Sequence, residues 1–246
     1  MTTHQIATQE QWLAASRALV EEEKFLSRLR DQLNEKRRAL PWVRLEKNYV
    51  FESTNGPVSL AGLFEGRSQL AIYHFMFAPD WDEGCTGCSL LCDHVDGARQ
   101  HFEHNGLGFA AVSRAPLAKL QAYRARMGWQ FRWVSSAARS FNYDFNVSFP
   151  AGAQGTDVFY NFATQPYPGI DDIPGVSMFF KDADGTIYHT YSSFSRGTEI
   201  LLGVYGWLDM APLGRNETGN GNLMDWVKRH DQYEIVNKTA SCRNHA

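Results

Sequence analysis

Residues 69–77 read QLAIYHFMF, and residues 78–92 continue as APDWDEGCTGCSLLC. The first stretch is a continuous apolar run bounded by turn residues, which is typical of a central strand buried on both faces. The second stretch begins as a loop, and the chain then favours a helix from Cys85 to Asn105. This order predicts a buried strand, a short loop, and a helix that carries Cys85 and Cys88 at its N-terminus.

Strands and helices continue to alternate after this helix. Residues 107–113 predict a second strand, 116–127 a second helix and 131–134 a third strand. Such alternation implies parallel strands joined by right-handed crossovers. Residues 176–181 and 186–191 flank the turn sequence DADG, which predicts an antiparallel hairpin. The fold class is therefore α/β, with a central mixed sheet flanked by helices.

A long helix precedes this domain. Thr8 and Gln11 form a candidate capping box, and Pro41 ends the segment. Large apolar residues recur every seven positions, at Trp12, Leu19, Leu26, Leu33 and Leu40. The alternate heptad positions include Glu22 and Lys36, which suit a sustained coiled coil poorly. We therefore favour an amphipathic arm that lies across its own domain, with a homodimer through this helix as the alternative.

The chain divides into three parts: an N-terminal helical arm at 1–41, a domain at 42–210 and a C-terminal extension at 211–246. Within the domain, residues 140–174 are rich in Phe, Asn, Gly and Pro and show no clear period. We expect an ordered but irregular insertion there, because its aromatic side chains need burial. A last helix is expected at 199–210 and a short one at 223–229.

The cysteine pair is the feature that carries chemistry. Free N–H groups at a helix N-terminus present partial positive charge, which stabilises a thiolate. The thiolate is the reactive species in disulfide exchange, and the Cys-x-x-Cys spacing lets a second sulfur resolve the mixed disulfide. We expect Cys85 to attack a disulfide and Cys88 to resolve the product.

Metal binding is an alternative reading of the same residues. His101 and His104 follow the pair at nearly the spacing of a zinc finger, but on one helix they face away from Cys88. An iron–sulfur cluster would need Cys92 and a distant fourth ligand such as Cys242. We expect no metal, while a purely structural pair of cysteines remains open.

Other titratable residues are expected to have ordinary roles. Cys92 lies one helical turn beyond Cys88 and is expected to be a buried helix residue. His74 lies inside the apolar run and is expected to be a hydrogen-bonded core histidine. His189 lies on the predicted hairpin, from which it could reach the cysteines.

Pro174 enters the predicted hairpin. Strand, Cys-x-x-Cys, helix, strand, helix, and then Pro and hairpin is the order found in thioredoxin-like domains. The resemblance implies that Pro174 is cis and shapes a substrate groove beside the cysteines. It also makes Trp81 a candidate wall of that groove. The chain lacks the Trp directly before the first Cys and the Pro between the two cysteines that thioredoxin has.

Several sequence blocks point to one bacterial family. They are FMFAPDWDEGCTGCS (75–89), VSRAPL (112–117), RMGW (126–129), WVSS (133–136), FNYDF (141–145), HTYS (189–192), SRG (195–197) and LDMAPLGR (208–215). With these blocks the chain resembles the bacterial domain-of-unknown-function family 899, described as predicted dithiol–disulfide oxidoreductases. The resemblance implies a thioredoxin-like fold with the helical arm and the C-terminal extension as additions. It implies thiol–disulfide exchange only through the cysteine pair.

Two rival functions remain. A peroxiredoxin-like peroxidase would place a hydroxyl residue between Pro79 and Cys85, where this chain has Asp82. A non-catalytic interaction protein or redox sensor would use the arm and the aromatic segment at 140–165 as its interaction surface. The substrate of an oxidoreductase would be a protein or small-molecule disulfide or thiol.

Composition excludes some classes of protein. The 246 residues include 24 Lys and Arg against 27 Asp and Glu, which gives a net charge of -3. The chain therefore lacks the basic excess of a nucleic-acid binder. No apolar stretch approaches the ~20 residues of a membrane span, and no Gly-rich dinucleotide fingerprint occurs. We expect a cytoplasmic protein without an organic cofactor.

Two carboxylates precede the first cysteine. Asp82 and Glu83 would oppose the helix N-terminus and raise the pKa of Cys85 toward ~8, near that of a free thiol. On this argument the pair is a reductant rather than an oxidant.

Overall fold

The computed structural model describes residues 5–137, 139–215, 217 and 224–234. The chain forms two compact units that divide after Trp42. The first contains helix α1 (Gln9–Arg38), which begins with the predicted capping box between Thr8 and Gln11. None of the side chains of α1, all of them described, is buried. Whether this helix lies across its own domain or pairs with a second copy stays a prediction.

The second unit is built on a sheet of eight strands among the described residues. These strands are β1 (Val43–Arg44), β2 (Val50–Ser53), β3 (Gly56–Ser59), β4 (Gln69–His74), β5 (Leu107–Ser113), β6 (Arg132–Ser135), β9 (Gly175–Lys181) and β10 (Ile187–Phe194). Their order is β1-β10-β9-β4-β5-β6-β2-β3. Strands β4, β5 and β6 are parallel, and β9 is antiparallel to both β4 and β10.

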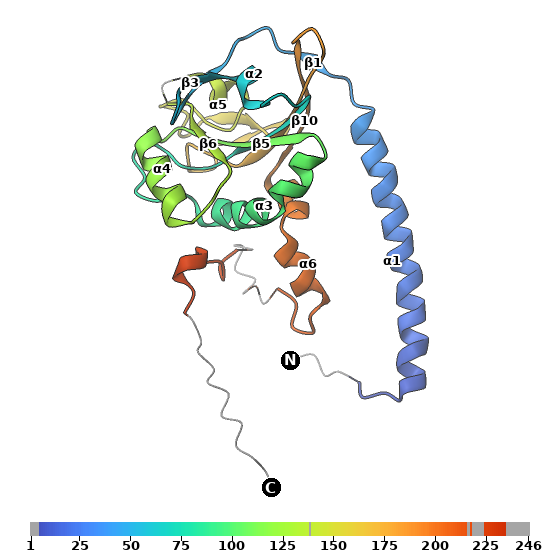
Figure 1. The fold of residues 1–246 in the computed structure, drawn as a ribbon. Coiled ribbons are helices and arrows are strands. Elements are labelled where there is room, and N and C mark those ends of the chain that lie inside the picture. The colour runs from blue at the N-terminus through green and yellow to red at the C-terminus, as the bar shows by residue number, and fades with distance from the viewer. Residues whose placement is uncertain (1–4, 138, 216, 218–223, 235–246) are drawn as a thin grey trace. The chain divides into compact units, whose positions relative to one another are not determined.

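Helices cover both faces of this sheet (Figure 1). They are α2 (Leu60–Leu63), α3 (Thr86–His104), α4 (Leu117–Arg126), α5 (Phe141–Asp144) and α6 (Gly203–Met210), with 3-10 segments η1 (Ser195–Leu201) and η2 (His230–Gln232). One buried cluster joins the sheet to α2 and α5, and a second joins it to α3 and α4. Side chains alternate along β4, so Ile72 enters the first cluster and Tyr73 the second.

This is a thioredoxin-like fold, as predicted. The four strands β10-β9-β4-β5 form its mixed core, with α3 crossing between the parallel strands β4 and β5. The predicted hairpin is formed by β9 and β10, with an irregular register between His189 and Tyr191. No helix in the described part of the chain is long and apolar enough to cross a bilayer.

The 140–174 insertion is ordered and mostly irregular. It contains α5 and a separate two-stranded sheet of β7 (Asp157–Tyr160) and β8 (Ala163–Pro166). Phe141, Phe145, Phe149 and Tyr160 are buried, as their aromatic character predicts, whereas Phe159 and Phe162 are exposed.

Two predicted helices differ from the structure. The predicted helix at 199–210 is broken at Leu202, whose backbone is non-helical, and this leaves η1 and α6 as separate pieces. The predicted helix at 223–229 is wrong where it can be checked: residues 224–226 form a turn and 227–229 are irregular. Leu223 lies outside the described residues.

Candidate active site

Cys85 is the N-cap residue of α3, so its side chain lies at the positive end of the helix. The loop from β4 returns there because the Cys85 N–H donates to the Met76 carbonyl, 3.0 Å away. Gly84 allows this path: a Cβ at that position would lie 2.7 Å from the Phe75 ring. The predicted placement of the cysteine pair at a helix N-terminus is therefore confirmed.

The surroundings of Cys85 favour its thiolate. The pKa of Cys85 is lowered to about 7, chiefly by a hydrogen bond with the Cys88 side chain, and burial opposes this shift. The backbone N–H groups of Gly87 and Cys88 and the positive charge of Arg229 lower the pKa further. This is the chemistry that donors at a helix N-terminus supply.

This value of the Cys85 pKa agrees with the predicted partial cancellation, because it lies nearer the ~8 of a free thiol than the ~3.5 of a strongly oxidising site. The Glu83 carboxylate is paired with two guanidinium groups, those of Arg126 and Arg229. The hydrogen bond with Cys88 is the largest cause of the lowered pKa of Cys85, and the charge of Arg229 is a smaller one. The sequence could not show the two partners of Glu83, since both lie far along the chain.

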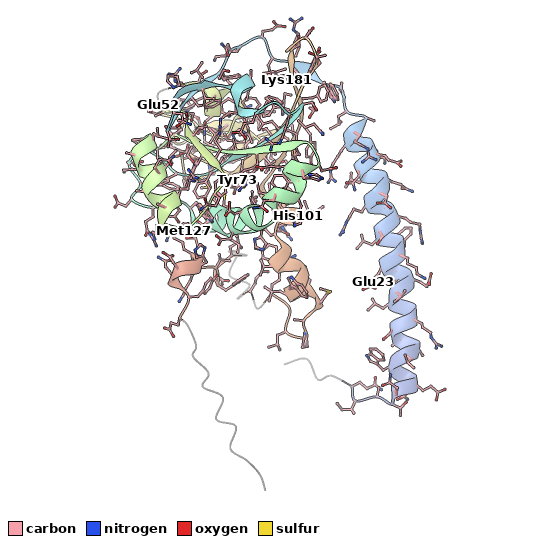
Figure 2. The ribbon with its side chains drawn as sticks, in the orientation of Figure 1. Glu23, Glu52, Tyr73, His101, Met127 and Lys181 are labelled. Carbon is pink, nitrogen blue, oxygen red and sulfur yellow. The ribbon has the colours of Figure 1, made fainter. Side chains whose placement is uncertain are left out.

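Cys88 has the opposite environment. It is 2% exposed, and burial together with the neighbouring Cys85 raises its pKa well above the ordinary value. The Tyr73 hydroxyl is a hydrogen-bonding partner of its thiol, and the Met76 N–H donates to the sulfur over 3.5 Å. Tyr73 itself lies in the interior of the domain (Figure 2). Cys92 is also a buried thiol with a raised pKa, as expected of a core residue.

A cavity of about 290 Å³ adjoins the two cysteines. Its lining residues are Tyr73, Met76, Cys85, Gly87, Cys88, Leu91, Pro174, Ser195, Arg196, Thr198, Glu199, Leu202, Tyr205 and Met224. The cavity thus combines mostly apolar walls with one charged side made by Arg196 and Glu199. The structure brings Pro174 beside Cys85 and Cys88, but Trp81 is not among the described residues that line the cavity.

One implication of the thioredoxin resemblance is wrong. No peptide bond among the described residues is cis, so Pro174 follows a trans bond. Its carbonyl accepts a hydrogen bond from the Tyr160 hydroxyl over 2.8 Å, and the Ser195 N–H donates to the same hydroxyl over 3.0 Å. Ser195 has a φ of 48°, a strained value for a residue other than glycine. Tyr160 therefore links two residues that line the cavity, Pro174 at the end of the insertion and Ser195 after β10.

The histidines lie away from the cysteines. His101 and His104 are in the last turn of α3, whereas Cys88 is in its first turn. His74 is 1% exposed, and its Nε2 lies 2.8 Å from the Ser177 hydroxyl, which confirms a hydrogen-bonded core histidine. His189 contacts the rings of Phe145 and Phe179, and it is not a lining residue of the cavity. Across the described residues, no group of three or more His, Cys, Asp or Glu side chains could hold a metal ion.

Residues of this site that were not singled out from the sequence include Tyr73, Tyr160, Met224 and Arg229. For Tyr73 the sequence does contain a signal. It lies one position before His74 on the strand, so the two side chains point to opposite faces of the sheet. The other three come from the insertion and the C-terminal extension, and their sequence contexts carry no motif that points to the cysteines.

The solved structures that are similar to this chain include peroxiredoxins. A bacterioferritin comigratory protein of Xanthomonas campestris, described by its alkyl peroxide reduction activity, is 13% identical with a TM-score of 0.43, over 63% of this chain and 87% of that chain. Peroxidoxin BcpB of Mycobacterium tuberculosis is 13% identical with a TM-score of 0.40, over 67% and 94%. A mutant of Xylella fastidiosa PrxQ is 12% identical with a TM-score of 0.43, over 68% and 95%.

The strand order given above is that of a thioredoxin-like fold without reference to these similarities. No curated protein matches the chain. The sequence model of the family described as "Bacterial protein of unknown function (DUF899)" matches residues 1–233. The chain belongs to this family.

Proposed function

We propose that the protein is a thiol–disulfide oxidoreductase. The Cys85 thiolate attacks one sulfur of a substrate disulfide, forms a mixed disulfide and releases the other sulfur as a thiolate. Cys88 then attacks the Cys85 sulfur, forms the Cys85–Cys88 disulfide and releases the second substrate sulfur as a thiolate. The Cys88 proton goes to a released thiolate. The substrate gains two electrons and the cysteine pair loses them.

The observation that carries this proposal is the opposite shift of two thiols one turn apart. Cys85 is partly exposed with a lowered pKa, and Cys88 is buried with a raised one. The negative charge of Cys85 is one cause of the raised pKa of Cys88. That charge disappears once Cys85 is in a mixed disulfide, so Cys88 becomes easier to deprotonate when it is needed.

The cavity narrows the class of substrate. Tyr73, Met76, Leu91, Leu202 and Tyr205 supply apolar walls next to the cysteines. A disulfide with an apolar group next to its sulfur would bury that group there, which favours binding by about 25 cal/mol per Å². We also propose that the protein works in the reducing environment of the cytoplasm. Helix α1 could join two copies into a homodimer, as the alternative to lying across its own domain.

Trapping the intermediate tests the proposal. In a Cys242→Ser background, Cys88→Ser should accumulate one substrate adduct on Cys85, detected by mass spectrometry of the intact protein. Cys85→Ser should form no adduct and reduce no disulfide. Cys92→Ser is the matched control, and it should turn over like the parent. Full turnover by Cys88→Ser would show that Cys88 is not the resolving thiol.

Peroxide reduction is the second candidate, because a partly exposed thiolate beside an apolar cavity suits an alkyl hydroperoxide too. Cys85 would attack the hydroperoxide, become a sulfenic acid and release an alcohol. Cys88 would then condense with it and release water, giving the same disulfide. Rates with a small apolar disulfide and with cumene hydroperoxide separate the two functions, and a hydroperoxide rate at least tenfold higher would overturn the first proposal.

A further inference from the structure

A segment from the C-terminal extension packs against the cysteine pair. We call residues 224–232 the C-terminal clasp; it lies beside α3 and α4 (Figure 1). Met224 lines the cavity, and a Cβ at Gly87 would lie 3.1 Å from the Met224 side chain. Val227 is 9% exposed, and the Trp226 ring lies 6.5 Å from that of Tyr205. The clasp is therefore packed on the domain by apolar contacts.

Arg229 of the clasp binds the two residues just before Cys85 through a hydrogen bond and an ion pair. Its Nη2 donates to the Gly84 carbonyl over 2.7 Å, and its Nη1 lies 2.8 Å from Glu83 Oε2. Its Nε donates to the Tyr123 hydroxyl over 2.7 Å. The side chain is only 14% exposed, so this guanidinium is a fixed charge rather than a solvated one.

The same guanidinium is linked to the first turn of α3. The Tyr123 hydroxyl lies 2.9 Å from the Ser89 hydroxyl, and the Ser89 hydroxyl donates to the Cys85 carbonyl over 2.8 Å. Arg229 thus holds the peptide that precedes Cys85 directly and the peptide that follows it through two hydroxyls. Removal of this side chain would leave the Gly84 carbonyl and the Glu83 carboxylate without that partner.

From these contacts we infer that the C-terminal clasp completes the redox site, with Arg229 as a positioning residue that holds a positive charge beside the Cys85 thiolate. The inference deepens the proposed function and rests on it for its biological meaning. The direction of the Cys85 pKa agrees, because the charge of Arg229 is among the causes that lower it.

Other charged groups around Cys85 do not replace this one. Arg126 is shared between Glu83 and Asp231, so its charge is matched by two carboxylates. Across the cavity, Glu199 is paired with Arg196 and Arg215. The neighbouring Tyr73 and Cys88 are buried with raised pKa values and are neutral at pH 7.

The test measures the pH dependence of Cys85 alkylation by iodoacetamide in full-length Cys242→Ser protein. Arg229→Gln should raise the Cys85 pKa by at least about 0.5 unit, and Arg229→Lys by less than half as much. Lys228→Gln is the matched control, because it removes the same charge from the neighbouring exposed side chain. It should leave the Cys85 pKa unchanged.

A second variant keeps the test decisive if Arg229→Gln fails to fold. Glu83 is a half-exposed partner of Arg229, so Glu83→Gln should fold and should lower the Cys85 pKa. The inference is overturned if Arg229→Gln leaves the pKa in place, if Lys228→Gln shifts it equally, or if Glu83→Gln does not lower it. Alkylation needs no disulfide substrate, so a protein that shows these shifts but reduces no disulfide would sink only the proposed function.

Discussion

Strand β4 carries two neighbouring titratable side chains to opposite faces of the sheet, and their fates differ. Tyr73 points to the face of α3, where the cysteine pair lies, and His74 points to the face of α5. Both are buried, at 2% and 1% exposure. On the first face a charged thiolate is favoured at Cys85, whereas on the second face burial lowers the pKa of His74 to about 3.

The two faces differ in the groups that surround the titratable side chain on each of them. His74 is stacked on the Phe141 ring at 5.6 Å and lies 5.7 Å from the Phe145 ring centroid. Its Nε2 begins a chain through the hydroxyls of Ser177 and Ser192 to His189, with contacts of 2.7–2.8 Å. None of these groups is an anion, so nothing compensates a buried imidazolium. Burial alone keeps a group neutral, and charge persists only where donors or opposite charges converge on it.

The largest expected effect is a loss of folding stability from a substitution on the face of α5. It should leave the redox chemistry on the face of α3 unchanged. Phe141 is 1% exposed and contacts the rings of Tyr49 and Phe51 at about 5 Å. Phe141→Ala should lower the free energy of unfolding by about 3–5 kcal/mol, measured by urea denaturation, because it leaves a cavity in the core. The Cys85 pKa should stay near 7 in the folded variant.

Phe159→Ala is the control for that substitution. Its side chain is 49% exposed, so the loss should be below about 1 kcal/mol. A shift of the Cys85 pKa in Phe141→Ala by more than about 0.5 unit would show that the two faces are coupled through the sheet.

The next effect concerns acid. The unfolded chain protonates His74 near pH 6.5, whereas the folded protein resists protonation down to about pH 3. The unfolded state therefore binds more protons below pH 6.5, and stability falls as the pH drops. Between pH 6.5 and 5 the loss from His74 is about 2 kcal/mol, above the pH range where most carboxylates titrate. Burial also lowers the pKa of His189, which adds a loss of the same sign.

His74→Gln separates this contribution from the rest. The variant should be less stable at pH 7 but should lose about 2 kcal/mol less than the parent between pH 6.5 and 5, as followed by urea denaturation. His101→Gln, at an exposed position, should keep the slope of the parent. An unchanged slope in His74→Gln would mean that His74 is not held neutral by burial.

Local sequence patterns predicted the parts of this contrast that depend on periodicity. The apolar run of residues 69–77 required a strand buried on both faces, and strict alternation then separates Tyr73 from His74. Turn residues before Cys85 and the helical segment after it placed the cysteine pair at a helix N-terminus. These features depend on neighbours within one or two turns of chain.

The rest depends on contacts between distant segments. Arg229 lies in a polar extension, and no local pattern indicates that it reaches Gly84. Tyr160 lies in an insertion without a period, so its hydroxyl could not be assigned to Pro174. The pairing of Glu83 could not be predicted for the same reason, since its two cationic partners come from α4 and the clasp.

The smallest effect tests a contact that joins the two faces. The Tyr160 ring belongs to the buried cluster of α2 and α5, yet its hydroxyl holds the Pro174 carbonyl and the Ser195 N–H at the edge of the cysteine cavity. Tyr160→Phe keeps the ring and removes both hydrogen bonds. Since burial raises the Tyr160 pKa to about 12, the hydroxyl stays protonated and donating throughout the neutral range.

We expect Tyr160→Phe to weaken substrate binding without changing the thiolate. The KM for an apolar disulfide should rise about fivefold, equivalent to ~1 kcal/mol for the lost bracing of Pro174 and Ser195. The Cys85 pKa should stay within about 0.2 unit of the parent, because Tyr160 is not among the groups that shift it. Tyr167→Phe is the matched control, since its hydroxyl donates to exposed Asp171 over 2.7 Å and Tyr167 is not a lining residue of the cavity. An unchanged KM in Tyr160→Phe would show that the Tyr160 hydroxyl does not support the substrate cavity. A shifted Cys85 pKa with an unchanged KM would instead place its influence on the helix N-terminus.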